Sequence, residues 1–407
     1  MSIHFHDRLS RVGPVAARFL RLSAAKAPGG THSVATPHSA SRKEMIIVVL
    51  SLTQCYAGGE KSVEVLISEW AKTCVVVVLA EHPAHLDALR KIEGANIHIL
   101  PAAPGKSIVS LLKNFLHLAG IIRRFGADVI LANSNKAAMV VALWRRFPGR
   151  PAIPTGIYLR SFGWRYLDFI LRSLPDSVVL APTAYVFEDA AYASTRLSRT
   201  RSAIVPNGAK IPSREPTNSE QENILCLATI TRWKGLHYLL EAFSLVVSEE
   251  PAARLRILGR VFDAAYFQEL QHQRKRLGLE GSVEFVPFVQ DPAEEYRKAR
   301  FLVVSSIAEF DGPETFSRVI IEAWAAHRTV VSFAVGGPKY IINPEINGLL
   351  VPEKNIAAFA QAMLLLTRDG ALRERLALAG FEEVKRRYGA DVVADQTLKV
   401  IHGRAPV

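Results

Sequence analysis

The sequence predicts an α/β protein with two doubly wound, Rossmann-like domains that face a central cleft. The chain has 407 residues, more than one hydrophobic core usually fills, and 49% of them are hydrophobic, which suffices for two cores. Short β-branched runs alternate with amphipathic segments along most of the chain, a pattern typical of parallel α/β sheets. A polar stretch at residues 212–222 interrupts the alternation and is typical of a linker.

The first predicted domain covers residues 45–211 and the second covers residues 223–380, with further helices in residues 381–407. Strands of the first domain are expected near Ile46, Val75, Ile97, Val129, Ile153 and Val178, and its helices near Val63, Leu86, Leu111, Ala138 and Leu167. Strands of the second domain are expected near Ile224, Leu255, Val283, Leu302, Val330 and Leu349. Domains of this class bind ligands at the carboxyl ends of their strands.

Residues 1–44 are interpreted as a disordered basic N-terminal extension. They hold seven Lys or Arg against Asp7 and Glu44, a net charge of +5. Arg18 and Arg21 interrupt any apolar core of a signal peptide. Met45 stands directly before the first predicted strand, which leads to the hypothesis that it is the functional start.

The net positive charge of the chain indicates which kinds of ligand it binds. A net charge of +12 favours acidic partners. Because the sequence shows no basic stripe interleaved with aromatic residues and no DNA-binding motif, we exclude nucleic acid and favour phosphorylated ligands or anionic lipid surfaces. One group of arginines in the first domain could face a membrane, with scattered surface arginines as the alternative. It consists of Arg123, Arg124, Arg145, Arg146 and Arg150.

Apolar runs and cysteines indicate the compartment. No run approaches the roughly 18 apolar residues that cross a bilayer, so we expect a protein that is soluble or lies on a membrane surface. Cys55, Cys74 and Cys226 are odd in number and lack metal-ligand spacing, which indicates a reducing compartment without a disulfide or zinc site. We expect a cytoplasmic protein, with the inner membrane face as a candidate location.

Two carboxylates, Glu314 and Glu322, stand eight positions apart around the start of a predicted helix. The run Glu309–Pro313 is typical of a loop, and from Ser317 onward apolar residues recur at helical spacing. Each ionised carboxylate can accept hydrogen bonds from two neighbouring hydroxyls, while a helix N-terminus between them favours phosphate. The pattern therefore fits a nucleotide sugar.

Lys234 follows a predicted strand by a short loop and precedes a helix with one apolar face. An ammonium beside a helix N-terminus attracts a diphosphate and would neutralise charge on a departing one. A solvated Lys at a helix start is the alternative interpretation.

At these positions the chain resembles the GT-B fold glycosyltransferases of the family 4 type (glycosyl transferases group 1), whose donor site carries a Glu, seven residues and a second Glu. Four more motifs occur in that family's order, namely Val205–Gly208, Lys234–Gly235, Gly336–Pro338 and Asn347–Pro352. The resemblance covers roughly residues 45 to 400. It implies that the last helices, from Phe381 through Val400, cross back to the first domain.

The resemblance also implies roles for individual residues. Lys234 should contact the donor phosphates, Glu314 the sugar hydroxyls and Glu322 the ribose, with Lys234 and Glu314 as catalytic residues. The predicted donor-binding residues are Thr229, Arg232, Lys234, Glu314, Phe316, Ser317 and Glu322. An i, i+4 ion pair between Arg318 and Glu322 is the alternative explanation of Glu322.

The predicted acceptor-side residues are Gly58, Gly59, Tyr158 and Arg160. Gly58 and Gly59 match the family's glycine-rich turn, where small residues let backbone NH groups approach a ligand. A plain turn before a helix is the alternative. The following residues imitate a P-loop, but Glu60 and Cys55 break that motif, so an ATPase is excluded.

Four positions depart from the family pattern. Thr229 replaces an Arg that partners Lys234, and Arg232 could substitute from the same loop. Ser317 replaces a Gly and could cap the helix. Tyr158 replaces a His two residues before Arg160, which could still meet phosphate or acceptor. Tyr340 replaces the Glu that follows the paired glycines.

The expected function, as the resemblance implies, is retaining transfer of a sugar from a nucleotide-diphosphate sugar to a saccharide or lipid-linked acceptor hydroxyl. Because both carboxylates would bind the donor, no pair flanks a glycosidic bond as in a hydrolase. No Asp-x-Asp motif occurs in the cleft-forming loops, so we expect no metal, and the nucleotide sugar is a substrate rather than a cofactor. The alternatives are a nucleotide-sugar epimerase or phosphorylase of the same fold, or a non-catalytic subunit that binds a partner enzyme.

Overall fold

The structure is a computed structural model that describes residues 44–94, 96–161, 164, 166–212, 223–289, 291–310 and 312–403. Except for Glu44 and Pro212, the predicted N-terminal extension and the predicted linker lie outside the described residues. The account below concerns the unit that begins at Glu44.

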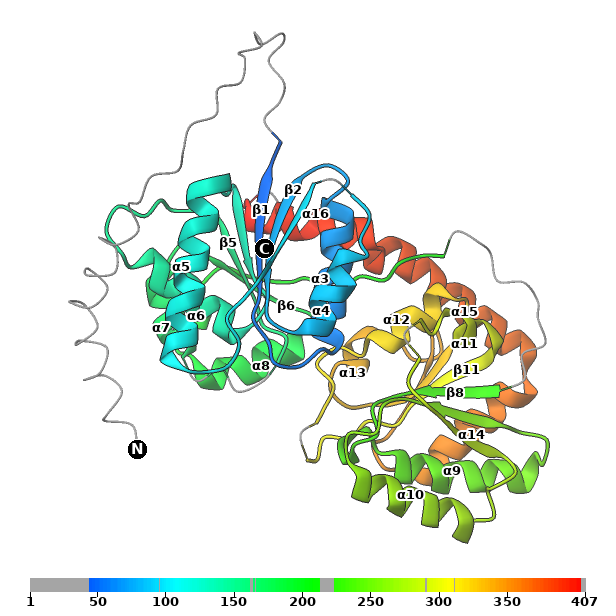
Figure 1. Cartoon of the computed structure of the whole chain (residues 1–407). Helices are drawn as coiled ribbons and strands as arrows, with labels where there is room; N and C mark the ends of the chain where they lie inside the picture. Colours follow the sequence, from blue (N-terminus) through cyan, green and yellow to red (C-terminus); the bar gives the residue numbers. More distant parts are fainter. Residues whose placement is uncertain are drawn as a thin grey trace. The chain divides into compact units, whose positions relative to one another are not determined.

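The first sheet has seven parallel strands in the order β3-β2-β1-β4-β5-β6-β7 (Figure 1). Its strands are β1 (Ile46–Ser51), β2 (Val75–Ala80), β3 (Ile97–Pro101), β4 (Val129–Ala132), β5 (Thr155–Tyr158), β6 (Val178–Ala181) and β7 (Ser202–Ile204). The central strands are buried on both faces, which explains their continuous Val, Ile and Leu runs.

Helices cover both faces of this sheet. They are α3 (Gly58–Trp70), α4 (Pro83–Arg90), α5 (Ile108–Phe125), α6 (Asn135–Arg145), α7 (Leu167–Ser173) and α8 (Ala184–Ala193), with a 3-10 turn η1 (Leu197–Arg199). One hydrophobic cluster joins the sheet to α5, α6 and α7, and a second joins its other face to α3 and α4. Figure 1 shows these two layers on opposite sides of the strands.

The second sheet has six parallel strands in the order β10-β9-β8-β11-β12-β13. They are β8 (Asn223–Leu227), β9 (Leu255–Leu258), β10 (Val283–Val286), β11 (Ala299–Val304), β12 (Val330–Phe333) and β13 (Leu349–Val351). Its helices are α9 (Leu236–Glu249), α10 (Ala264–Arg276), α11 (Ala293–Lys298), α12 (Arg318–Ala325), α13 (Pro338–Ile341), α14 (Ile356–Arg368) and α15 (Gly370–Glu383), with a 3-10 turn η2 (Arg232–Lys234). Hydrophobic clusters fill both faces of this sheet as well.

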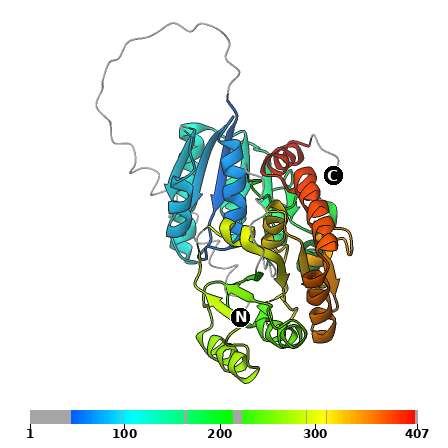
Figure 2. The ribbon, with the colours of Figure 1, turned by 90° about the vertical axis from the view of Figure 1, so that its right-hand side faces the viewer.

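The last helix, α16 (Ala390–Ile401), follows a π-helical turn η3 (Val384–Tyr388) and packs against the first sheet and α3. Trp70 Nε1 donates a hydrogen bond to the carbonyl of Ala394 at 3.1 Å. Arg201 Nη2 donates to the carbonyl of Val400 at 2.9 Å. Figure 2 shows this helix, in dark red, beside the first sheet.

The predicted fold class is confirmed, since each of the two sheets is parallel and covered by helices. A strand lies at or within two residues of all twelve predicted strand positions. The sequence analysis missed β7 and α8. β7 is a three-residue edge strand, Ser-Ala-Ile, which is too short to show an alternating pattern.

Each sheet has one point where the strand order reverses, between β1 and β4 in the first sheet and between β8 and β11 in the second. Doubly wound folds bind ligands beyond the carboxyl ends of the strands at this point. Within the described residues, no helix is long and apolar enough to cross a membrane.

The packing of α16 can be tested at Gly156 in β5. A Cβ at this position would lie 2.7 Å from Ile401 Cδ1, so Gly156→Ala should destabilise the fold by about 1–3 kcal/mol in urea unfolding. Ile401→Val removes that methyl group and should recover much of the loss. Gly281→Ala, with no atom within 4 Å of its Cβ, is the control. Strictly additive effects of Gly156→Ala and Ile401→Val would contradict the contact.

Candidate active site

Lys234 and Glu314 form an ion pair across the switch point of the second sheet. Lys234 lies in η2 after β8, and Glu314 lies in the loop after β11. Their side chains are 13% and 15% exposed. Ser306 Oγ donates a hydrogen bond to Glu314 Oε1 at 3.3 Å. The pair therefore offers a cation and a hydroxyl-binding carboxylate in one partly buried place.

Gly235 fixes the turn that carries Lys234. It has a φ of 61°, and a Cβ here would lie 2.1 Å from the carbonyl oxygen of Ser305. In return, Ser305 Oγ donates a hydrogen bond to the carbonyl of Lys234 at 2.8 Å. Only glycine permits this approach, so the turn after β8 is held against the loop after β11.

Gly336 and Gly337 hold the segment that carries Glu314. Gly337 N donates to the carbonyl of Glu314 at 2.6 Å. A Cβ on Gly337 would lie 2.4 Å from Phe316 N, and a Cβ on Gly336 would lie 2.6 Å from the Glu314 carbonyl oxygen. The paired glycines thus support the Glu314 loop through its backbone.

Phe316 and Ser317 follow Glu314 and are both buried. The Phe316 ring belongs to the hydrophobic cluster beneath α12 and makes an edge contact with Tyr388. The Phe316 side chain therefore packs in the hydrophobic core and holds the segment in place, so only its backbone is available to a ligand at the site.

The expectation that Ser317 caps α12 with its side chain is wrong. Ser317 occupies the N-cap position but makes no cap hydrogen bond. Its φ of 70° is left-handed instead of the extended conformation from which a capping oxygen reaches the first helical NH groups. This conformation suits a glycine, and the Ser317 hydroxyl is buried with no hydrogen-bond partner among the described residues.

Glu322 belongs to a network that also reaches the first sheet's helices. Arg318 Nη2 donates to Glu322 Oε1 at 2.7 Å, and the Tyr296 hydroxyl donates to Oε2 at 3.0 Å. Arg318 Nη1 donates to Ser62 Oγ of α3 at 3.0 Å. Burial and the nearby Glu322 raise the pKa of Tyr296, so this hydroxyl stays protonated. The i, i+4 ion pair exists, but it is partly buried and has further partners.

Arg232 does not join Lys234. Its guanidinium pairs with Glu269 of α10 and lies 5.1 Å from the Tyr266 ring centroid. Thr229 lies in the loop between β8 and η2, where its carbonyl accepts a hydrogen bond from Thr231 N at 3.0 Å. The proposed substitution of Arg232 for the missing Arg is therefore not realised in this structure, because Glu269 holds its side chain toward α10.

Arg160 faces the glycine-rich turn of the first sheet. Arg160 Nε donates to Asn133 Oδ1 at 2.5 Å, and Arg160 Nη1 donates to Asn207 Oδ1. A Cβ on Gly59 would lie 3.3 Å from Arg160 Cδ, and one on Gly58 would lie 3.5 Å from Arg318 Cδ. Two arginines, one from each half of the chain, thus converge on the N-terminus of α3.

Tyr158 packs beneath Arg160 and contacts the turn that carries Asn207. It is fully buried, and its hydroxyl donates to the carbonyls of Val205 and Pro206. The Arg160 guanidinium carbon lies 3.7 Å from the Tyr158 ring centroid. Tyr158 therefore holds the turn that carries Asn207 and provides a face for Arg160 instead of reaching the site itself.

Residues of the first and the second half of the chain contact each other next to Glu314. Thr183 Oγ1 donates to the carbonyl of Thr315 at 2.8 Å. Tyr340, which replaces the family's Glu, donates its hydroxyl to Glu188 of α8 at 2.7 Å. The loop that carries Glu314 is therefore also part of the contact between the halves.

The sequence analysis predicted no site role for Asn133, Asn207, Tyr296, Ser305 and Ser306, although Asn207 lies in its Val205–Gly208 motif. Asn133 and Ser305 each come directly after a strand that flanks a switch point. Their position at the end of these strands could have identified them as site residues. The role of Tyr296 depends on a contact 26 positions away, which no local pattern reveals.

Comparison with known proteins gives a family match for part of the chain. Residues 209–383 match the family Glycosyl transferases group 1. A D-inositol 3-phosphate glycosyltransferase from Thermomonospora curvata is 31% identical over 288 residues, which are 68% of this chain and 57% of the relative. The lipopolysaccharide core biosynthesis glycosyltransferase LpsE from Rhizobium meliloti is 28% identical over 185 residues, 46% of this chain and 51% of the relative. The chain thus spans about half the length of these curated relatives.

The fold also matches a solved structure. HepE from Anabaena, in complex with UDP and glucose, has a TM-score of 0.72 at 20% identity, covering 88% of this chain and 100% of that chain. The chain therefore has the GT-B glycosyltransferase fold. Residues 209–383 belong to glycosyl transferases group 1, as the motifs predicted.

The buried position of Tyr158 predicts a specific pH dependence. Burial raises its pKa from 10.0 to about 12. The pKa of Tyr158 is higher in the folded protein than in the unfolded chain. The neutral, hydrogen-bonded hydroxyl therefore contributes its full share of the unfolding free energy below pH 10, and this share is lost as the pH rises through about 12. Between these pH values the wild type should lose about 2–3 kcal/mol more of its unfolding free energy than Tyr158→Phe. Parallel pH profiles in urea unfolding would contradict this.

Proposed function

We propose that this protein is a retaining glycosyltransferase that moves a sugar from a nucleoside-diphosphate sugar to a hydroxyl of a saccharide or lipid-linked acceptor. The observation that carries the proposal is the Lys234–Glu314 ion pair at the switch point of the second sheet. The matching family and the solved HepE complex with UDP and glucose support it.

In this proposal residues 223–380 bind the donor. The Lys234 ammonium and the N-terminus of α9 attract the diphosphate. Glu314 accepts hydrogen bonds from sugar hydroxyls, and Glu322 accepts them from the ribose. The Ser317 hydroxyl, which is buried without a hydrogen-bond partner among the described residues at the start of α12, is a further candidate donor to the diphosphate.

Residues 45–211 form the acceptor side, and residues 381–407 complete it by crossing back. Gly58 and Gly59 let the side chains of Arg318 and Arg160 approach the N-terminus of α3, where these arginines supply positive charge for an anionic ligand. Desolvation lowers the pKa of Arg160, yet guanidinium groups stay charged in proteins.

The reaction breaks the bond between the sugar's anomeric carbon and the β-phosphate oxygen. The acceptor oxygen forms a bond to the same carbon from the same face, which keeps the anomeric configuration. The acceptor proton passes to an oxygen of the departing diphosphate. Lys234 offsets the charge that develops on this leaving group, and closure of the two halves excludes water. No step needs a metal ion.

Lys234 is the most direct test of the proposal. Addition of UDP, GDP or ADP should raise the melting temperature for at least one nucleotide, because a ligand of the folded state stabilises it. Lys234→Ala should abolish that shift and lower kcat with the matching nucleotide sugar by about 100-fold or more. Lys298→Ala is the control, since it removes an exposed, ion-paired lysine of the same half. Wild-type behaviour of Lys234→Ala would refute the proposal.

Glu322 should act on donor affinity. Glu322→Gln keeps the shape but removes the charge, so the Kd for the nucleoside diphosphate should rise about tenfold, as measured by calorimetry. Glu294→Gln is the matched control, because Glu294 also pairs with an arginine on a helix of the same half but lies far more exposed. An unchanged Kd for Glu322→Gln would show that its ion pair is only structural.

A further inference from the structure

Helix α5 exposes a row of large apolar side chains. Val109 is 62% exposed and Leu116 is 46% exposed. Ile108, which precedes Val109, and Leu112, which lies between Val109 and Leu116, are exposed as well. Positions i, i+1, i+4 and i+8 lie on one face of a helix. The opposite face, with Phe115, Leu118 and Ile121, is buried against the first sheet. The exposed row is therefore not part of the core.

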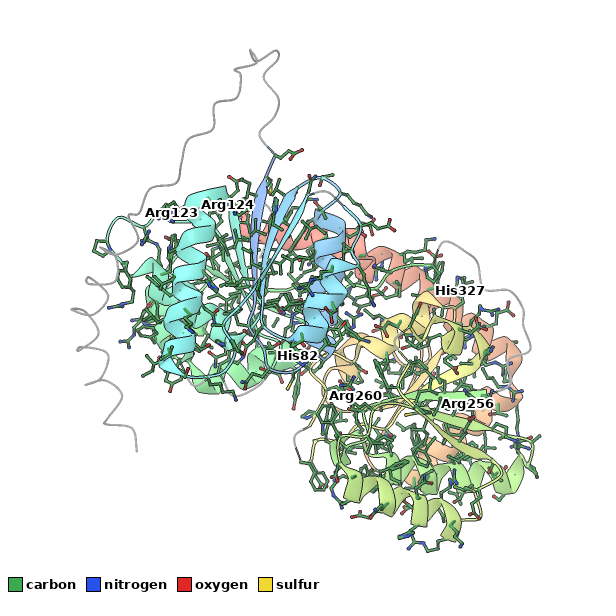
Figure 3. All side chains as sticks on the ribbon, in the orientation of Figure 1. His82, Arg123, Arg124, Arg256, Arg260 and His327 are labelled. Carbon is green, nitrogen blue, oxygen red and sulfur yellow. The ribbon has the colours of Figure 1, made fainter. Side chains whose placement is uncertain are left out.

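The segment around this row of apolar side chains contains Lys and Arg residues but no Asp or Glu. Residues 94–127 contain four Lys or Arg and no Asp or Glu. Lys106, Lys113, Arg123 and Arg124 are all exposed, and none of them forms an ion pair within the described part of the chain. Figure 3 shows Arg123 and Arg124 together at the C-terminal end of α5.

The same surface continues onto α6. Phe147, which follows α6, is 40% exposed and contacts the Phe115 ring at a centroid distance of 4.8 Å. Arg146 is exposed beside it and lies 5.6 Å from the Phe169 ring centroid. Because α5 and α6 flank parallel strands, their C-terminal ends lie at the same edge, so Arg123, Arg124 and Arg146 share that edge.

We propose that this surface, the α5 face, docks on an anionic lipid bilayer. It consists of Ile108, Val109, Leu112 and Leu116 with Lys113, Arg123 and Arg124. A helix with an exposed apolar row and flanking Lys and Arg binds at the interface of anionic membranes, where the apolar side chains enter and the cations meet headgroups. A second copy of the chain fits less well, since a two-fold contact would bring together two surfaces that both carry uncompensated positive charge.

The N-terminal end of α5 is held rigidly near the acceptor side. Lys136 Nζ donates to Glu81 Oε2 at 2.8 Å and to the carbonyl of Gly105 at 2.6 Å, and Gly105 N donates to Glu81 Oε1 at 2.7 Å. This network fixes the loop before α5 at the carboxyl edge of the sheet, the edge that also carries Gly58 and Arg160. If the proposed function holds, docking brings a lipid-linked acceptor to that edge.

Vesicle binding of the full-length chain tests the docking. The wild type should co-sediment with vesicles of phosphatidylcholine and phosphatidylglycerol, and much less with phosphatidylcholine alone. Leu116→Glu should weaken binding at least about tenfold. Leu365→Glu is the matched control, because Leu365 is a helical leucine of the second half that is also 46% exposed, and it should bind as the wild type does. Arg123→Gln and Arg124→Gln should each weaken binding about fivefold.

Three results would overturn the proposal. The first is a wild type that does not bind the anionic vesicles. The second is equal binding of Leu116→Glu and Leu365→Glu. The third is a loss of self-association in Leu116→Glu, measured by sedimentation, without a loss of vesicle binding, which would assign the surface to a second copy. The melting-temperature shift with nucleoside diphosphates is measured on the same variants, so a failed docking proposal is distinguished from a failed donor-site proposal.

Discussion

The candidate site depends on the close approach of two loops that brings Lys234 and Glu314 together. Both loops follow strands at the one place where the second sheet reverses its order. Gly235 brings the Lys234 turn against Ser305, and Gly336 with Gly337 supports the Glu314 segment. A side chain at any of these three glycines would collide with backbone. Backbone packing thus places the ammonium and the carboxylate close together, because the attraction within a largely buried ion pair is offset by the cost of removing both charges from water.

The segment from Glu314 to Glu322 has three roles at once. Its first residue faces the candidate donor site, its Phe316 ring anchors it in the core, and Arg318 reaches Ser62 across to the first half. A change in the contact between the halves would therefore act on the segment that carries Glu314 and Glu322. This gives a physical basis for coupling domain closure to donor binding in the proposed reaction.

The sequence was sufficient for the fold and for the placement of Lys234 and Glu314 in loops that follow buried strands. Buried parallel strands leave continuous apolar runs, and loops that end on Lys234 or Glu314 follow those runs directly. It was not sufficient for contacts set by tertiary packing. The backbone at Ser317 is left-handed, which prevents the cap that its residue type suggests, and Glu269 draws Arg232 toward α10. The partners of Arg160 lie 27 and 47 positions away, so only the assembled sheet brings them together.

A crystal structure with a bound nucleoside-diphosphate sugar would test the central claim most directly. The account predicts the diphosphate within hydrogen-bonding distance of Lys234 Nζ and the N-terminus of α9, the sugar hydroxyls at Glu314 and the ribose at Glu322. A ligand bound instead in the hollow at the opposite edge of the second sheet, lined by Asn223, Arg256, Glu295 and Lys298, would contradict it.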